Sequence, residues 1–151
     1  MQTASNPRST VQIAGHPVHV MLVPFVIAFY TGCFAADLAF AYTGDEFWAR
    51  GAYVLLITGV AASALAATVG LLDFLFEPRI RALNAAWWHF AGNAAAALVS
   101  IVDLYLRWRE GAAAGSHDYM WMSLVVFLLL LFNGWMGWSM VYKHHVGVAD
   151  A

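Results

Sequence analysis

The chain has 151 residues, of which 62% are hydrophobic and 11% charged, with a net charge of −2 and a mean hydropathy of +0.68. A soluble domain carries about 25% charged residues, so this chain has too few charges to cover a surface that faces water. It also has no basic run, and we expect no nucleic-acid partner. The composition predicts a protein whose main solvent is the lipid bilayer.

Four apolar runs follow one another along the chain, at residues 18–42, 52–76, 84–106 and 119–142. Each has at least about 20 residues, the length with which a helix crosses the hydrocarbon layer. Backbone groups in lipid must find their hydrogen bonds within the segment, so these runs are expected to be helices. The connections are short, which predicts an all-α fold, a four-helix transmembrane up-down bundle over 15–148 with tails at 1–14 and 149–151.

This topology places both termini and the connection around residues 77–81 at one end of the bundle. That end holds four cations, and the opposite end holds three, Arg50, Arg107 and Arg109. Since positive charge marks the cytoplasmic side, the count favours cytoplasmic termini. Aromatic residues such as Tyr42 and Trp87 stand at the ends of the runs, as expected at the level of the lipid headgroups.

Most of the histidines fall at the end with the termini. Pro17 suits the first position of a helix, so His16 is expected at the N-cap and His19 one turn into the helix, on the same side. His89 lies in the early turns of the third run, and His144, two residues beyond the fourth run, is expected at the end of the fourth helix. Ionisable groups near the membrane interior are costly and usually functional. We therefore expect His16, His19, His89 and His144 to converge, whereas His117, at the opposite end, and His145 are expected in solvated loops.

Three other residues are expected to belong to this cluster. Asp73 is in the last turn of the second run, Asn93 shares a helix face with His89, and Gly137 shares a face with His144. The carboxylate of Asp73 is expected to orient an imidazole. The missing side chain at Gly137 can leave room for a flat ligand. At the opposite end, Asp103 and Arg107 are expected to form a helix-end salt bridge, and Asp37 with Asp103 could alternatively hold a proton or a cation.

Imidazoles inside a helical bundle have several common roles. They can bind haem as axial ligands, or bind zinc, copper or iron directly with a carboxylate such as Asp73 completing the shell. They can also relay protons. A further alternative is a structural membrane subunit whose histidines line an interface. The sequence has no nucleophile elbow, phosphate loop or zinc-protease motif, and no catalytic residue is assigned.

Several motifs resemble a known bacterial family of membrane proteins. They are "GHPVHVMLVPF", "GLLDF", a histidine early in the third run, and "GWMGWSMVYKHHVGV". Together they resemble the family catalogued as domain of unknown function 2231, over residues 15–148. His16 and His19 match its first motif, whereas Val20 stands in place of a proline; in the last motif Gly137 and His144 match, and Trp138 and His145 replace glycines.

The resemblance implies a bacterial protein, and some relatives are joined to Rieske iron–sulfur domains, which by analogy favours electron transfer. We therefore expect a small membrane redox protein in the bacterial inner membrane that carries haem b. Its expected partners are the lipid bilayer and either quinone or a dehydrogenase, with self-association left open. The leading alternative is a haem-free membrane protein that binds Zn, Cu or Fe through the same four histidines.

Overall fold

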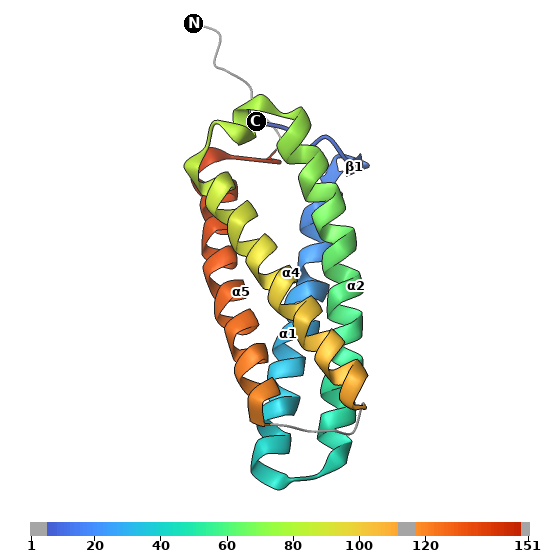
Figure 1. Cartoon of the computed structure of the whole chain (residues 1–151). Helices are drawn as coiled ribbons and strands as arrows, with labels where there is room; N and C mark the ends of the chain where they lie inside the picture. The colour runs from blue at the N-terminus through green and yellow to red at the C-terminus, as the bar shows by residue number, and fades with distance from the viewer. Residues whose placement is uncertain (1–5, 112–116, 149–151) are drawn as a thin grey trace, which may run out of the picture.

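The computed structural model describes residues 6–111 and 117–148, and in this part of the chain four long helices form an elongated bundle (Figure 1). The elements are, in chain order, β1 Gln12–Ile13, β2 His16–Pro17, α1 Val18–Thr43, α2 Glu46–Phe76, α3 Pro78–Arg81, α4 Asn84–Glu110 and α5 His117–His144. The predicted C-terminal tail at 149–151 lies outside the described residues.

The four long helices confirm the predicted all-α bundle. Each is long and apolar enough to cross a membrane. The helix α1 packs against α2 and α5, and α4 packs against α5 and α2. Because α1 and α4 share both neighbours, they lie diagonally across the bundle axis.

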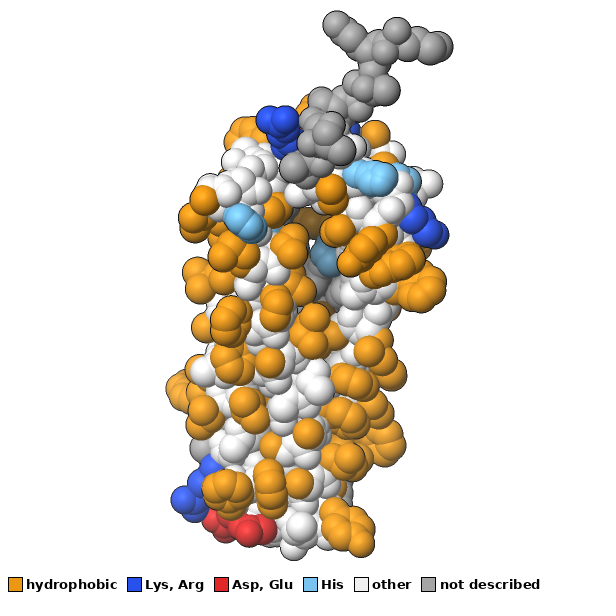
Figure 2. All heavy atoms as spheres, turned by 180° about the vertical axis from the view of Figure 1, so that it is seen from behind, with side chains coloured by type: hydrophobic (Ala, Val, Ile, Leu, Met, Phe, Trp, Pro, Cys, Tyr) orange, Lys and Arg blue, Asp and Glu red, His pale blue; other side chains and the backbone are white. Residues whose placement is uncertain are grey.

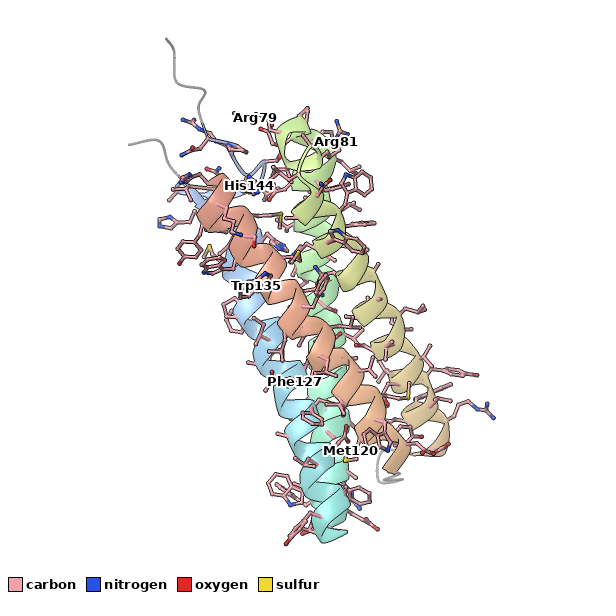
Figure 3. The ribbon with its side chains drawn as sticks, turned by 90° about the vertical axis from the view of Figure 1, so that its left-hand side faces the viewer. Arg79, Arg81, Met120, Phe127, Trp135 and His144 are labelled. Carbon is pink, nitrogen blue, oxygen red and sulfur yellow. The ribbon has the colours of Figure 1, made fainter. Side chains whose placement is uncertain are left out.

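The predicted up-down order is also confirmed. In Figure 1 the start of α1, the segment of α3 and the end of α5 lie at one end of the bundle. Figure 3 places Arg79, Arg81 and His144 at this end and Met120 towards the other. Within the described residues, the segments next to the two chain ends meet at this end, because Gly147 donates its backbone N–H to the carbonyl oxygen of Pro7.

The start of the first helix differs from the prediction. Pro17 is not helical but extended, and it precedes the first residue of α1. It pairs with Gln12, and His16 pairs with Ile13, in a small antiparallel hairpin. The two turn residues, Ala14 and Gly15, both have positive φ, as a two-residue turn of type I′ requires. The expectation that His16 and His19 share a helix face was therefore wrong, because the hairpin holds His16 outside the helix.

The second helix begins six residues before the predicted apolar run. The carboxylate of Asp45 accepts a hydrogen bond from the backbone N–H of Phe47 at 2.9 Å and caps the helix at Glu46. The short helix α3 occupies the connection that was expected to be a loop. His117, expected in a loop, is the first residue of α5.

Glycines let the helices pack closely around a small core, and many large apolar side chains face outward. Tyr30, Cys33 and Leu56 belong to the buried core, and a Cβ at Gly59 would come within 2.9 Å of the Tyr30 ring. Such close approach drives helix association where lipid offers no hydrophobic force. The face shown in Figure 2 carries apolar side chains along the length of the bundle, as a surface in contact with lipid must.

Candidate histidine site

Two histidines from diagonal helices meet inside the bundle, at the end with the termini. His19 is the second residue of α1, and His89 is the sixth residue of α4. Their ring centroids are 6.2 Å apart, with the ring planes at 85°. Both side chains are half-buried. We refer to His19 and His89 as the histidine pair.

Each ring of the pair is fixed by a carbonyl of a neighbouring helix. His19 Nδ1 lies 2.9 Å from the carbonyl oxygen of Ala66 in α2, and His89 Nδ1 lies 3.0 Å from that of Asn133 in α5. A carbonyl can only accept, so Nδ1 donates in both rings and carries the hydrogen. In a neutral imidazole the lone pair is then on Nε2, which leaves that nitrogen able to bind a metal. All four long helices thus contribute to the orientation of the pair.

Glycines allow both rings to lie against the neighbouring helices. A Cβ at Gly70 of α2 would be 2.8 Å from His19 Nδ1, closer than side chains tolerate. A Cβ at Gly137 of α5 would be 3.5 Å from His89 Cε1, an ordinary contact. The predicted space beside Gly137 is thus bordered by the His89 ring. Gly70 was not predicted, although it stands in the "GLLDF" motif.

Two asparagines continue the site towards the middle of the bundle. Asn93 donates from Nδ2 to the carbonyl oxygen of His89 at 2.8 Å, and Asn133 donates to Asn93 Oδ1 at 3.4 Å. Asn133 is 3% exposed, and its Oδ1 is the one buried side-chain N or O atom without a hydrogen bond in the described part of the chain. This oxygen points at Gly92. Asn93 was predicted to belong to the site, whereas Asn133 was not, because its only signal is an amide within an apolar run.

Asp73 has a different set of partners from those expected. Its carboxylate accepts hydrogen bonds from Ser9 Oγ at 2.8 Å and from the backbone N–H groups of Thr10 at 2.6 Å and Val11 at 3.4 Å. The prediction placed an imidazole there. The N-terminal segment folds back over the end of α2 and supplies these donors instead, which the sequence alone did not indicate.

The other two predicted ligands lie at the same end but are exposed. His16 Nδ1 is 3.0 Å from the carbonyl oxygen of Ala14 in the hairpin turn, and His144 is the last residue of α5. Over residues 6–111 and 117–148, no three His, Cys, Asp or Glu side chains are grouped as a metal site would require. The structure therefore brings together two of the four predicted imidazoles.

The opposite end holds a buried ion network in place of an open cation site. Arg107 donates to Asp103 from Nε at 2.8 Å, which confirms the predicted pair within α4. Its terminal nitrogens also donate to both oxygens of Asp37 in α1, at 2.8 and 2.7 Å. Because the guanidinium occupies the space between the two carboxylates, this cluster holds the helices together.

Comparison with known proteins agrees with the membrane assignment. A family model described as "Predicted membrane protein (DUF2231)" matches residues 15–150. No curated protein and no solved structure matches the chain. The family match and the four apolar helices together identify an integral, multi-pass membrane protein.

Proposed function

Because the chain belongs to the DUF2231 family of predicted membrane proteins and pairs two oriented imidazoles inside its bundle, we propose that it is a small membrane redox carrier. In this proposal His19 and His89 would hold haem b. The protein exchanges electrons with quinone or with a partner dehydrogenase in the bacterial inner membrane. The observation that carries the proposal is the histidine pair itself, with rings 6.2 Å apart on diagonal helices and both Nδ1 atoms held by carbonyls.

The number of ligands favours haem over a directly bound ion. Two imidazoles complete the axial coordination of a haem iron, whereas a structural zinc site takes four protein ligands and a catalytic one three. With metal–nitrogen distances of about 2.0–2.1 Å, two imidazoles on one ion have centroids roughly 5–6 Å apart. The observed separation of 6.2 Å lies just above that range.

The residues around the pair would tune and protect a bound group. Haem supplies one-electron transfer when it is bound. The carbonyls of Ala66 and Asn133 fix the tautomer of each ring and raise the basicity of Nε2. Gly70 and Gly137 leave room for the rings beside α2 and α5. The chain itself thus provides ligands in one defined orientation within an apolar bundle.

The test is the absorption spectrum of the detergent-solubilised protein, purified after expression with haem supplied. We expect a Soret band, and visible bands that sharpen when dithionite is added. His19→Ala and His89→Ala should each abolish or shift this spectrum. His144→Ala and His16→Ala are the matched controls, because these histidines are exposed at the same end of the bundle, and both should keep it.

The same preparation separates the alternatives. Colourless protein with stoichiometric zinc, copper or iron, lost in the His19→Ala variant, would replace haem by a directly bound ion. Colourless, metal-free protein that is monodisperse and helical would refute both cofactor proposals and support a structural subunit. Loss of haem in His144→Ala with retention in His19→Ala would reject the histidine pair as the ligand set.

A further inference from the structure

We infer that the histidine pair is closed towards water and open towards the bilayer, so that its electron partner is a lipid-soluble carrier of the quinone type. This inference rests on the proposed redox function and narrows its two partners to one. It follows from three features of the end with the termini: a covering formed by the terminal segments, a hollow in the side of the bundle, and a row of aromatic rings on α5.

The covering is formed by residues 6–17 and 145–148, which we call the terminal roof. Asp73, near the end of α2, accepts three hydrogen bonds from residues 9–11. It is one helical turn beyond Gly70, where an added Cβ would lie 2.8 Å from His19 Nδ1. The N-terminal segment is therefore fastened directly above the helix turn that borders the histidine pair.

The C-terminal residues complete the terminal roof. Gly147 donates its backbone N–H to the carbonyl oxygen of Pro7 at 2.8 Å, and Asn6 donates to the carbonyl oxygen of Val148 at 3.3 Å. Gly147 also packs on Pro17, two residues before His19, with only 3.0 Å between its Cβ position and Pro17 Cγ. The two terminal segments are thus bonded to each other across the aqueous end of the bundle.

The side of the bundle is less closed than its end. Figure 2 shows a hollow between two ridges in the half of the molecule that carries the termini, with a histidine side chain set back inside it. At this end of the bundle His19 and His89 are half-buried, whereas His16, His144 and His145 are exposed. The side chain in the hollow therefore belongs to the histidine pair, and the hollow opens through a surface that is otherwise apolar.

The nearby face of α5 suits a flat partner. Trp135 and Trp138 stack with centroids 5.9 Å apart, and Trp138 and Tyr142 are 5.2 Å apart. Gly137 lies between Trp135 and Trp138 in the chain, and the His89 ring lies beside its Cβ position. Stacking on exposed aromatic rings stabilises planar ligands. A quinone has such a planar ring, dissolves in the bilayer, and can reach the hollow without crossing the terminal roof.

The electron balance is simple. One quinol becomes quinone by losing two electrons and two protons. Each haem-loaded protein accepts one electron, so one quinol reduces two protein molecules in succession, and the two protons leave to the water at the membrane surface.

Access to the histidine pair from lipid and from water can be measured without any cofactor, on the full chain in lipid nanodiscs. A spin label is attached at Gly137→Cys in a Cys33→Ala background, with Leu128→Cys as the lipid-exposed control and Lys143→Cys at the aqueous end. We expect the label at residue 137 to collide with oxygen as at residue 128 and to be shielded from a water-soluble nickel chelate. Collision with the chelate equal to that at residue 143 would overturn the inference.

Redox kinetics give an independent measurement on haem-loaded protein in proteoliposomes. A short-chain quinol should reduce it severalfold faster than a membrane-impermeant reductant, and Asp73→Ala should raise the rate with the impermeant reductant by loosening the terminal roof. Glu46→Gln, which removes an exposed ion pair at the opposite end, should leave this rate unchanged. If the protein binds haem but the impermeant reductant reduces it faster than the quinol does, the inference of access from the bilayer is refuted and the proposed function still stands. If the protein binds no haem, the proposed function is refuted.

Discussion

Arg107 of α4 and Asp37 of α1 form a bidentate ion pair inside the bundle, although 70 residues separate them in the chain. Their side chains are only 4% and 5% exposed. The same guanidinium also binds Asp103 and lies 4.7 Å from the centroid of the Tyr119 ring in α5. Because α1 and α4 are diagonal, this network joins helices that share no broad contact, at the end opposite the histidine pair.

Replacing Arg107 by methionine should strongly destabilise the protein. Removal of one partner of a buried ion pair leaves an uncompensated charge and costs about 3–5 kcal/mol. Here two carboxylates, Asp37 and Asp103, would lose their shared donor. The free energy of unfolding can be measured in mixed micelles by titration with a denaturing detergent, with helical circular dichroism as the signal.

Arg109→Met is the control for this prediction. Arg109 is exposed and lies over the Tyr105 ring at 5.9 Å. Exposed charges contribute little to stability, so this variant should unfold close to the wild type. Equal stability of the two variants would mean that the buried network does not hold the helices.

Much of the fold could be predicted because it follows from one strong constraint. In lipid, a run of about 20 apolar residues must form a helix to satisfy its backbone hydrogen bonds. Short connections between such helices then determine the up-down order. The errors occurred where water replaces lipid. Residues 12–17 form a hairpin through the turn at Ala14 and Gly15, and a proline that suited a helix start stands in a strand instead.

The candidate site could be predicted only in part, for a physical reason. Helix periodicity places residues on a face, and it correctly brought His89 and Asn93 to one side of α4. It does not give the rotation of one helix against another, which decides that His19 meets His89 while His144 is exposed. Nor does it reveal that the chain ends fold back.

The topology predicts which ends share a membrane side. Reporter fusions after Arg81 and Val148 should lie on the same side, and fusions after Thr43 and Gly111 on the other, because α1, α2, α4 and α5 alternate in direction. The fused reporters are two enzymes, each active on only one side of the membrane, so their activities show on which side each fusion point lies. Fusions at Arg81 and Val148 that report different sides would contradict the common end on which the histidine pair and the terminal roof depend.

A methyl group at Gly92 should force α4 and α5 apart. The Cβ of alanine there would collide with Asn133 Oδ1, a buried atom that cannot move outward freely. Overpacking of this kind costs typically about 1–3 kcal/mol, measured by the same detergent titration. Gly134→Ala is the matched control on α5, because nothing lies within 4 Å of its Cβ position. A neutral Gly92→Ala would show that the helix contact is loose.

The two glycines that border the histidine pair should respond differently to alanine. At Gly70 the added Cβ would lie 2.8 Å from His19 Nδ1, the atom that bonds to Ala66, so the ring must turn and lose that hydrogen bond. At Gly137 the Cβ would lie at an ordinary 3.5 Å from His89 and should fit. Because ligand orientation depends on such supporting bonds, losing one typically lowers affinity about 10–100-fold.

Titration of haem into each purified variant measures this difference directly. Gly70→Ala should bind haem about 10–100-fold more weakly than the wild type. Gly137→Ala should bind haem nearly as well as the wild type. Gly137→Leu should bind haem more weakly, because its larger side chain would lie against His89. Helical content and monodispersity must be equal in all three, so that a weaker titration reports the site rather than unfolding. Equal affinity of Gly70→Ala and the wild type would mean that His19 does not need its bond to Ala66, and would remove the oriented imidazole on which the proposed ligand set depends.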